Sequence, residues 1–334
     1  MGVEADPLSR HPGMGEAAMP AGTATTALPR PAAGAAPARW RGHLGRWAPH
    51  LVLWPPLLVS VLHVVSFTLY TTWISFTPST LLPEYDWVGL QNYVSVLNSR
   101  NWKIASSNLL IYGAGFVLLT TALGLLLAVL IDQRIRAENL FRAIFLYPMA
   151  VSFVVTGTVW AWLLNPAVGI QHLVRGLGFE SFRFDWLVDR EMAIYTIVIA
   201  GAWQASGFAM ALFLAGIRSV DADLYKAAQI DGAGSWRIYR RVVLPCIGPI
   251  FVAVLVILLQ FTIKTFDLVR ALTGGGPGLA TQLPTLVVYD LMFQRGLLGR
   301  GGAAAVLLLL YLLAVLLPYF AYARWRRRKE ARHG

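Results

Sequence analysis

The chain of 334 residues is 57% hydrophobic and only 13% charged, with a mean hydropathy of +0.58. Soluble domains carry about 25% charged residues, so this composition excludes a soluble domain and predicts an integral membrane protein with several spans. The net charge of +11 would suit a nucleic-acid binder, but the basic residues stand beside apolar runs, as topology signals do, and we expect no nucleic-acid partner.

The N-terminal stretch is rich in Ala, Pro, Gly and Thr and lacks apolar periodicity, which predicts a disordered cytoplasmic tail over residues 1–47. Six apolar runs follow, each long enough to cross about 30 Å of hydrocarbon. They lie at roughly 51–73, 109–131, 143–164, 193–214, 247–269 and 303–323. We therefore predict an all-α integral membrane fold with six transmembrane helices.

Basic residues in the connections indicate how these spans are oriented. The connections after the second, fourth and sixth runs are rich in Arg and Lys, among them Arg136, Arg237 and Arg327. The opposite connections hold acidic residues such as Glu84 and Asp86. Since basic connections stay in the cytoplasm, both termini are predicted to be cytoplasmic.

A polar segment of residues 221–245 lies between the fourth and fifth runs, on the predicted cytoplasmic side. Its pattern predicts two short helices joined by a glycine bend. The predicted parts are a first helix over Leu224–Ile230 capped by Asp221 or Asp223, a left-handed Gly232, and a second helix capped by Ser235. A helix, bend and helix at a membrane surface form a shape suited to docking onto a partner.

The same segment contains Ala227, Ala228, Asp231, Gly232 and Ala233, followed by Tyr239, Leu244 and Pro245. This pattern closely resembles the EAA loop of ABC-importer permeases, in which the loop is the coupling helix that docks into a cleft of the ATPase subunit. The family usually has Glu where this chain has Lys226, which reverses the charge at that contact. The alternative interpretation is an ordinary amphipathic cytoplasmic loop.

Other stretches are similar to the carbohydrate-uptake branch of that family, the maltose and glycerol-phosphate type. Trp87–Tyr93 in the first external loop is similar to its VGLxNY signature, and Leu272–Gly278 with Thr281 is similar to its LTGGGP…T stretch. The external segment of residues 165–189, with Leu214–Val220, is most similar to the permeases of bacterial glucose/mannose importers.

The resemblance covers about residues 50–325. Together with the apolar runs it gives the tail of residues 1–47, a first transmembrane helix and external loop over 48–105, a permease core over 106–325 with its coupling loop at 218–246, and a basic cytoplasmic tail over 326–334. It implies a multi-pass protein of the bacterial inner membrane, surrounded by lipid. It also implies a second homologous permease, a homodimeric cytoplasmic ATPase that binds ATP and Mg²⁺, and an external solute-binding protein, with no cofactor bound by this chain.

Polar residues inside the fourth and fifth runs are candidates for the substrate pathway, because ionisable groups within spans are functional candidates by default. Gln260, Lys264 and Asp267 are spaced by four and three residues, which places them on one face of a continuous helix. These residues either line a sugar path or include a Lys264–Asp267 pair that neutralises itself. Trp203 either stacks on a sugar ring or simply packs, and Gln204 lies at a similar depth.

The sequence contains no catalytic constellation, no metal-binding spacing and no Walker A motif, so we expect a transport subunit and not an enzyme. The predicted function is ATP-driven import of a mono- or oligosaccharide such as glucose or mannose. The alternatives are an ABC permease for glycerol phosphate or an amino acid, a stand-alone secondary transporter, and a membrane-embedded enzyme.

Overall fold

The computed structural model describes residues 40–133 and 135–333, so most of the predicted N-terminal tail lies outside the described residues. Helix α1 runs from Trp40 to Ile74, and helical backbone therefore begins inside the stretch predicted as a tail over residues 1–47. The chain divides into two units between Ser60 and Val61, and the second unit contains the end of α1 and all later helices of the described residues. The described residues form helices and connections without a β-strand, in agreement with the predicted all-α fold.

Four helices are long and apolar enough to cross a membrane, and two bent pairs meet the same test together. The four are α1, α3 (Arg100–Asp132), α7 (Ala193–Arg218) and α14 (Leu298–His333). The bent pairs are α4 (Glu138–Ala150) with α5 (Phe153–Leu163), and the run from α9 (Ser235–Ile238) through η1 (Tyr239–Val243) and α10 (Leu244–Cys246) with α11 (Gly248–Lys264). Counting each bent pair as one span gives six spans within the described residues, the number predicted.

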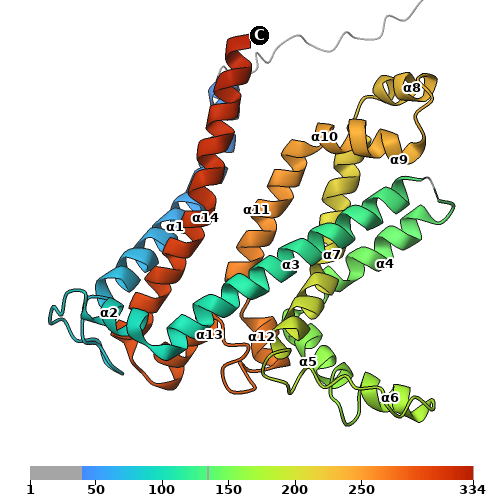
Figure 1. The fold of residues 1–334 in the computed structure, drawn as a ribbon. Helices are drawn as coiled ribbons and strands as arrows, with labels where there is room; N and C mark the ends of the chain where they lie inside the picture. Colours follow the sequence, from blue (N-terminus) through green and yellow to red (C-terminus); the bar gives the residue numbers. More distant parts are fainter. Residues whose placement is uncertain (1–39, 134, 334) are drawn as a thin grey trace, which may run out of the picture. The chain divides into compact units, whose positions relative to one another are not determined.

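Shorter helices lie between these spans: α2 (Gln91–Asn98), α6 (Ile170–Gly176), α8 (Ala222–Ile230), α12 (Asp267–Leu272), α13 (Pro284–Tyr289) and η2 (Asp290–Gln294). Figure 1 shows α8 and α9 near one end of α7 and α11, with α5 and α12 near the other end. Helices α8 and α9 are therefore separated from α5 and α12 by the length of α7 and α11.

Helix α7 is the central helix of the second unit, since 67% of its most apolar window is buried inside the protein, against 33% for α3. Small residues let the neighbouring helices approach it closely. A Cβ added at Gly124 of α3 would lie 2.6 Å from the Cβ of Ala209, and one added at Gly207 would meet the backbone carbonyl of Phe145 on α4. Helices α3, α4 and α7 thus form a tightly packed group.

The third predicted span, residues 143–164, is not one straight helix, because α4 and α5 meet at an angle of 98°. Pro148 lies inside α4, where its ring and its missing N–H disrupt the helical hydrogen bonds, and the helix ends two residues later. The carbonyl of Val151, which follows the helix, accepts a hydrogen bond at 2.8 Å from the side-chain amide of Gln204 on α7. A contact from a neighbouring helix therefore holds the bend.

The fifth predicted span, residues 247–269, ends earlier than expected. Helix α11 stops at Lys264, and the Thr265 hydroxyl bonds back to the preceding turn at 2.8 Å, which competes with regular helix. The carbonyl of Thr265 accepts a hydrogen bond from Thr285 at 2.7 Å instead of continuing the helix. The prediction that one helical face carries all three polar candidates is therefore wrong, because they divide between two helices: Gln260 and Lys264 on α11, and Asp267 on α12.

Candidate functional site

The 221–245 segment has the predicted architecture of a helix, a bend and a second helix. The side chain of Asp221 accepts a hydrogen bond from the backbone N–H of Asp223 at 2.9 Å, so Asp221 caps α8 as predicted. Ser235 does not cap the second helix, because Gly234 occupies that position with an extended backbone and Ser235 is already the first helical residue. The helices themselves follow the local sequence pattern.

The bend after α8 is a Schellman motif, which explains its small residues. Gly232 has a φ of +73°, and its N–H donates to the carbonyl of Gln229 at 3.0 Å. The N–H of Ala233 donates to the carbonyl of Ala228, also at 3.0 Å. These two bonds end an α-helix when the residue after it is left-handed, a conformation that glycine adopts at little cost. The predicted role of Gly232 in the backbone is confirmed.

The eight predicted coupling residues divide into an exposed group and an anchoring residue. Lys226, Ala227, Asp231, Gly232 and Pro245 are exposed, and Ala228 and Ala233 are half-buried. The exception is Tyr239, which is only 7% exposed and packs in the core. Tyr239 therefore holds the segment from inside, whereas the other residues leave its outer face open to a partner.

Lys226, the residue that reverses the usual charge, lies on the exposed side of α8. Its Nζ is 3.0 Å from Oδ1 of Asp223, one helical turn away, and both side chains are mostly exposed. An exposed pair of this kind contributes about 0–1 kcal/mol to stability. The ammonium group is thus held on the surface and remains accessible to a partner.

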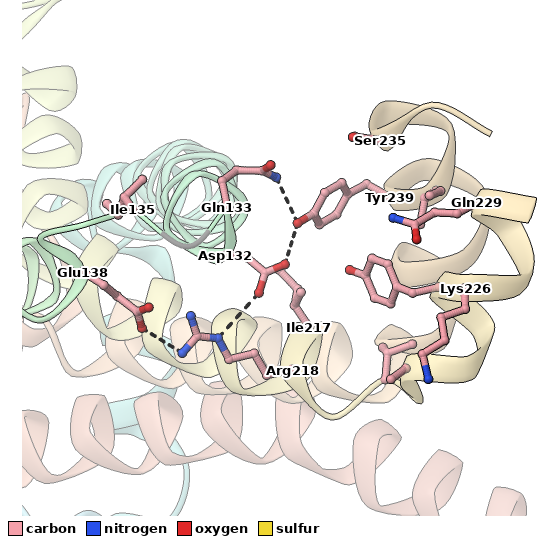
Figure 2. A pocket seen from close by; sticks show the side chains of 14 residues that line it. Asp132, Gln133, Ile135, Glu138, Ile217, Arg218, Lys226, Gln229, Ser235 and Tyr239 are labelled. Atoms are coloured by element: carbon pink, nitrogen blue, oxygen red, sulfur yellow. Dashed lines mark hydrogen bonds and ion pairs between the residues drawn. The ribbon is translucent and has the colours of Figure 1, made fainter. Parts of the chain in front are cut away.

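Tyr239 joins the 221–245 segment to the end of α3. Its hydroxyl donates to Oδ2 of Asp132 at 2.5 Å and accepts from the side-chain amide of Gln133 at 3.1 Å, as Figure 2 shows. The ring of Tyr225 on α8 packs edge-on against the ring of Tyr239, with centroids 6.4 Å apart. A single phenol thus contacts both α8 and the last turn of α3.

Asp132 also takes part in an ion-pair network between helix ends. Its Oδ1 lies 3.5 Å from Nε of Arg218, the last residue of α7, and Nη1 of Arg218 lies 2.8 Å from Oε1 of Glu138, the first residue of α4. Arg142 lies 3.5 Å from the same Glu138 oxygen. Neither Asp132 nor Glu138 was predicted from the sequence, in which Arg218 is simply one of several basic residues in the connection after the fourth apolar run. The sequence does contain one indication of them: Asp132 and Glu138 are acidic residues in a connection that is otherwise basic.

A crevice of about 1020 Å³ lies between this network and α8, and we name it the Asp132 crevice. Asp132, Gln133, Glu138 and Arg218 line one side of it, and α8 and α9 line the other (Figure 2). The hydroxyl of Tyr225 is buried and has no hydrogen-bond partner among the described residues. Burial raises the pKa of the Tyr225 phenol and the nearby Asp132 carboxylate raises it further, whereas the neighbouring Tyr239 hydroxyl lowers it by less, so the phenol stays neutral.

A second cavity of about 300 Å³ lies among α3, α4, α5, α7, α11 and α12, and we name it the Gln204 pocket. Its walls are mainly apolar, with side chains such as Phe116, Met149 and Phe261. Its polar residues include Gln204, Lys264 and Asp267, which are three of the five predicted pathway residues. The structure thus brings these three together, although they come from three helices.

The other two predicted pathway residues, Trp203 and Gln260, are not among the residues that line this pocket. Trp203 is 42% exposed, and its ring packs edge-on against Trp160 with centroids 5.9 Å apart. Of the two interpretations of Trp203, packing therefore describes its position in this structure. Gln260 is half-buried on α11, one turn before Lys264.

Gln204 is the most constrained polar group of the pocket, with only 2% of its surface exposed. Its amide nitrogen donates to Val151, while its Oε1 is buried and has no hydrogen-bond partner among the described residues. A buried acceptor without a donor costs about 1–3 kcal/mol, so this oxygen is suited to a hydroxyl or N–H group from a ligand.

Lys264 and Asp267 are both exposed, and no ion pair joins them within the part of the chain that the structure describes. The self-neutralising pair weighed from the sequence is therefore absent here. The described residues also contain no group of three or more His, Cys, Asp or Glu side chains that could hold a metal ion.

The sequence matches the protein family described as "Binding-protein-dependent transport system inner membrane component" over residues 109–330. The chain belongs to this family and is a multi-pass protein of the inner membrane. The resemblance to ABC-importer permeases drawn from the 221–245 segment is thereby confirmed. So is the expectation of a transport subunit and not an enzyme.

Curated relatives agree with this assignment. The chain is 38% identical over 257 residues to "Probable ABC transporter permease protein PH1215" of Pyrococcus horikoshii, which covers 76% of this chain and 88% of the relative. It is 36% identical over 259 residues to "Xylose/arabinose import permease protein XacH" of Haloferax volcanii, covering 76% of this chain and 81% of the relative.

Solved structures of low sequence identity share the fold. A chain from "Crystal structure of a bacterial ABC transporter involved in the import of the acidic polysaccharide alginate" superposes with a TM-score of 0.73. The match covers 86% of this chain and 99% of that chain at 22% identity. The arrangement of helices is thus that of an ABC-importer permease.

Proposed function

We propose that the chain is the permease subunit of an ATP-driven sugar importer, that it forms the translocation pathway with a second homologous permease, and that the 221–245 segment couples it to a cytoplasmic ATPase. The observation that carries this proposal is the exposure of α8, because none of its residues is buried. Ile230 and Trp236 in this segment are 86% and 73% exposed, and large apolar groups on an exposed helical segment are suited to the groove of a partner.

The remaining partners follow from the family. A homodimeric ATPase binds ATP and Mg²⁺, and an external solute-binding protein delivers the substrate to the permease pair. A structural relative at 22% identity is described as a complex with an "alginate pentasaccharide-bound periplasmic protein", which supports such a delivery step for this chain. Both termini are cytoplasmic in this proposal.

The chemistry of the Gln204 pocket favours a neutral, hydroxyl-rich substrate, such as glucose, mannose or an oligosaccharide. Aromatic walls, and an amide oxygen of Gln204 that has no hydrogen-bond partner among the described residues, suit the apolar faces and hydroxyl groups of a sugar. Among the lining residues Lys264 is the one basic side chain, whereas a phosphate group favours several. Glycerol phosphate is the alternative substrate, because one relative at 30% identity is named for sn-glycerol-3-phosphate transport.

In the proposed cycle, closure of the ATPase pair moves the 221–245 segment and rotates the third to fifth spans. These spans supply most of the Gln204 pocket, so their rotation changes the side from which the pocket is open. The pathway opens first to the binding protein and then, after hydrolysis, to the cytoplasm.

Uptake into proteoliposomes tests this proposal. The vesicles contain this permease, its partner permease and the ATPase, with ATP on the ATPase side and sugar-loaded binding protein on the other. Uptake of labelled sugar is expected only when all components and ATP are present. Uptake by this chain alone under an ion gradient, without ATP, would identify a secondary transporter and overturn the proposal. Competition by glycerol 3-phosphate but not by glucose or mannose would select the alternative substrate.

A further inference from the structure

Three of the four side chains that meet at the Asp132 crevice come from helix ends, and the fourth, Tyr239, comes from within the continuous helical run of α9, η1 and α10. Asp132 is the last residue of α3, Arg218 the last of α7, Glu138 the first of α4 and Tyr239 the first of η1. Arg218 and Glu138 suit their positions, because a cation favours the C-terminus of a helix and an anion the N-terminus. Asp132 is an anion at a C-terminus, where its own helix disfavours it. Its position is explained only by its partners.

The two carboxylate oxygens of Asp132 have separate partners. Oδ2 accepts a hydrogen bond from the Tyr239 hydroxyl at 2.5 Å, and Oδ1 lies 3.5 Å from Nε of Arg218. Arg218 continues the connection to Glu138 at 2.8 Å. One side chain thus joins the 221–245 segment directly to α3, and through Arg218 to α7 and α4 (Figure 2).

This polar connection forms part of the wall of the Asp132 crevice, where the Tyr239 ring also packs in the core. The crevice of about 1020 Å³ separates α8 from the ends of α3, α4 and α7. Within the described residues, the side-chain hydrogen bonds between the 221–245 segment and residues 132–133 all involve the hydroxyl of Tyr239. The same three spans supply Tyr112, Met149 and Gln204 to the Gln204 pocket.

We propose that Asp132 is a positioning residue for coupling, which transmits movement of the 221–245 segment through Tyr239 to α3, and through Arg218 to α7 and α4. This inference rests on the proposed function, because it assumes that the segment docks on an ATPase. To the proposed function, this inference adds the side-chain contacts that connect the 221–245 segment to the spans around the Gln204 pocket. Asp132 itself touches neither the ATPase nor the substrate in this route.

Two neighbouring tyrosines provide a matched pair of variants. Tyr239→Phe removes the hydroxyl that bonds to Asp132 and keeps the ring that packs against Tyr225. Tyr225→Phe removes a hydroxyl that forms no hydrogen bond to Asp132 or Gln133, whose phenol partner is Tyr239. Both variants lose one oxygen at the same crevice, and only Tyr239→Phe breaks the connection.

The experiment uses the complete importer in proteoliposomes. It measures uptake and the ratio of ATP hydrolysis with and without loaded binding protein. Tyr239→Phe is expected to lower uptake and this ratio by about tenfold, the size expected for a hydrogen bond to a charged group. Tyr225→Phe is expected to match the wild type. Size-exclusion chromatography of the extracted complex measures assembly for each variant.

A double-mutant cycle separates coupling from general stability. Asp132→Asn combined with Tyr239→Phe is expected to be no worse than the more defective single variant, because both break the same connection. The inference is overturned by additive losses, by equal losses in Tyr239→Phe and Tyr225→Phe, by wild-type transport in Tyr239→Phe, or by failure of Tyr239→Phe to assemble. Failure of the proposed function is distinguishable, since the wild-type complex itself would then show no ATP-driven uptake.

Discussion

The 221–245 segment is shaped by bonds between near neighbours, such as Ala233 to Ala228, whereas the Gln204 pocket depends on a bond between residues 53 positions apart. The segment is exposed on its outer face, and the pocket is assembled from six helices. Substitutions in the segment should therefore affect transport by changing the backbone conformation of the bend or the charge of the exposed surface. Changes in the pocket should act on several helices together.

The largest effect is expected from Gly232→Val, which should reduce uptake to background while leaving membrane insertion intact. A left-handed conformation costs a residue with a Cβ roughly 1–2 kcal/mol, and more when it is β-branched. An added Cβ at Gly232 meets nothing within 4 Å, so the effect comes from the backbone and not from a clash. Uptake, stimulated ATP hydrolysis and the amount of permease in the membrane are measured together.

Gly234→Val is the matched control for this variant. Gly234 has a φ of −66° and a ψ of 158°, which valine adopts readily, and an added Cβ there also meets nothing within 4 Å. It should retain most uptake. Normal uptake in Gly232→Val, or equal loss in both variants, would contradict a specific requirement for the left-handed bend.

A smaller effect, about a tenfold loss of uptake, is expected from Gln204→Leu. Leucine keeps much of the volume but leaves the carbonyl of Val151 without its donor, at a cost of about 1–3 kcal/mol, and removes the buried Oε1. Gln260→Leu is the control, since Gln260 is on α11 outside the pocket lining. Initial rates of sugar uptake compare them, and a larger loss in Gln260→Leu would place the polar pathway elsewhere.

Lys226→Glu is expected to weaken the affinity between the permeases and the ATPase by about fivefold or less, because it reverses one surface charge. If Lys226 faces an acidic group of the ATPase, the loss appears at low salt and shrinks as salt is added. Titration of detergent-extracted permeases with the ATPase at two salt concentrations measures it, with Lys226→Gln as the neutral control. Identical affinity at low salt would assign Lys226 to a solvated face, where its partner is Asp223 alone.

The smallest effect is expected from Lys264→Met, about twofold on uptake of a neutral sugar. Lys264 is exposed, and substitutions at exposed sites usually change free energies by about 0.5 kcal/mol or less. Parallel uptake assays with a neutral sugar and with glycerol 3-phosphate distinguish the two substrate classes. Loss of transport for the natural substrate would indicate an anion that pairs with this ammonium group.

Features that depend on neighbouring residues were predictable from the sequence. The helix of α8, its Asp221 cap and the left-handed Gly232 follow from residue types at fixed offsets, and the apolar runs follow from composition. Pro148 offered a local signal for the break in the third span, but the side chain that stabilises the break is on another helix.

Features that depend on distant pairs were not predictable in this way. The hydrogen bond between Tyr239 and Asp132 joins residues 107 positions apart, and neither has a local pattern that names the other. Tyr239 was assigned to the coupling loop by resemblance alone, and the resemblance did not distinguish an exposed residue from an anchor. The early end of α11 also depends on Thr285, which lies 20 positions away.

The bond from Gln204 to Val151 has a consequence for biogenesis. In the bilayer interior an unpaired backbone carbonyl costs several kcal/mol, so the bend between α4 and α5 is poorly stable in lipid until α7 has arrived. The ribosome synthesises α4 and α5 before α7. We therefore expect the nascent bent segment to keep this carbonyl in contact with water or with the insertion machinery until α7, which carries Gln204, has been inserted. These three helices should consequently enter the membrane as a group and not one after another.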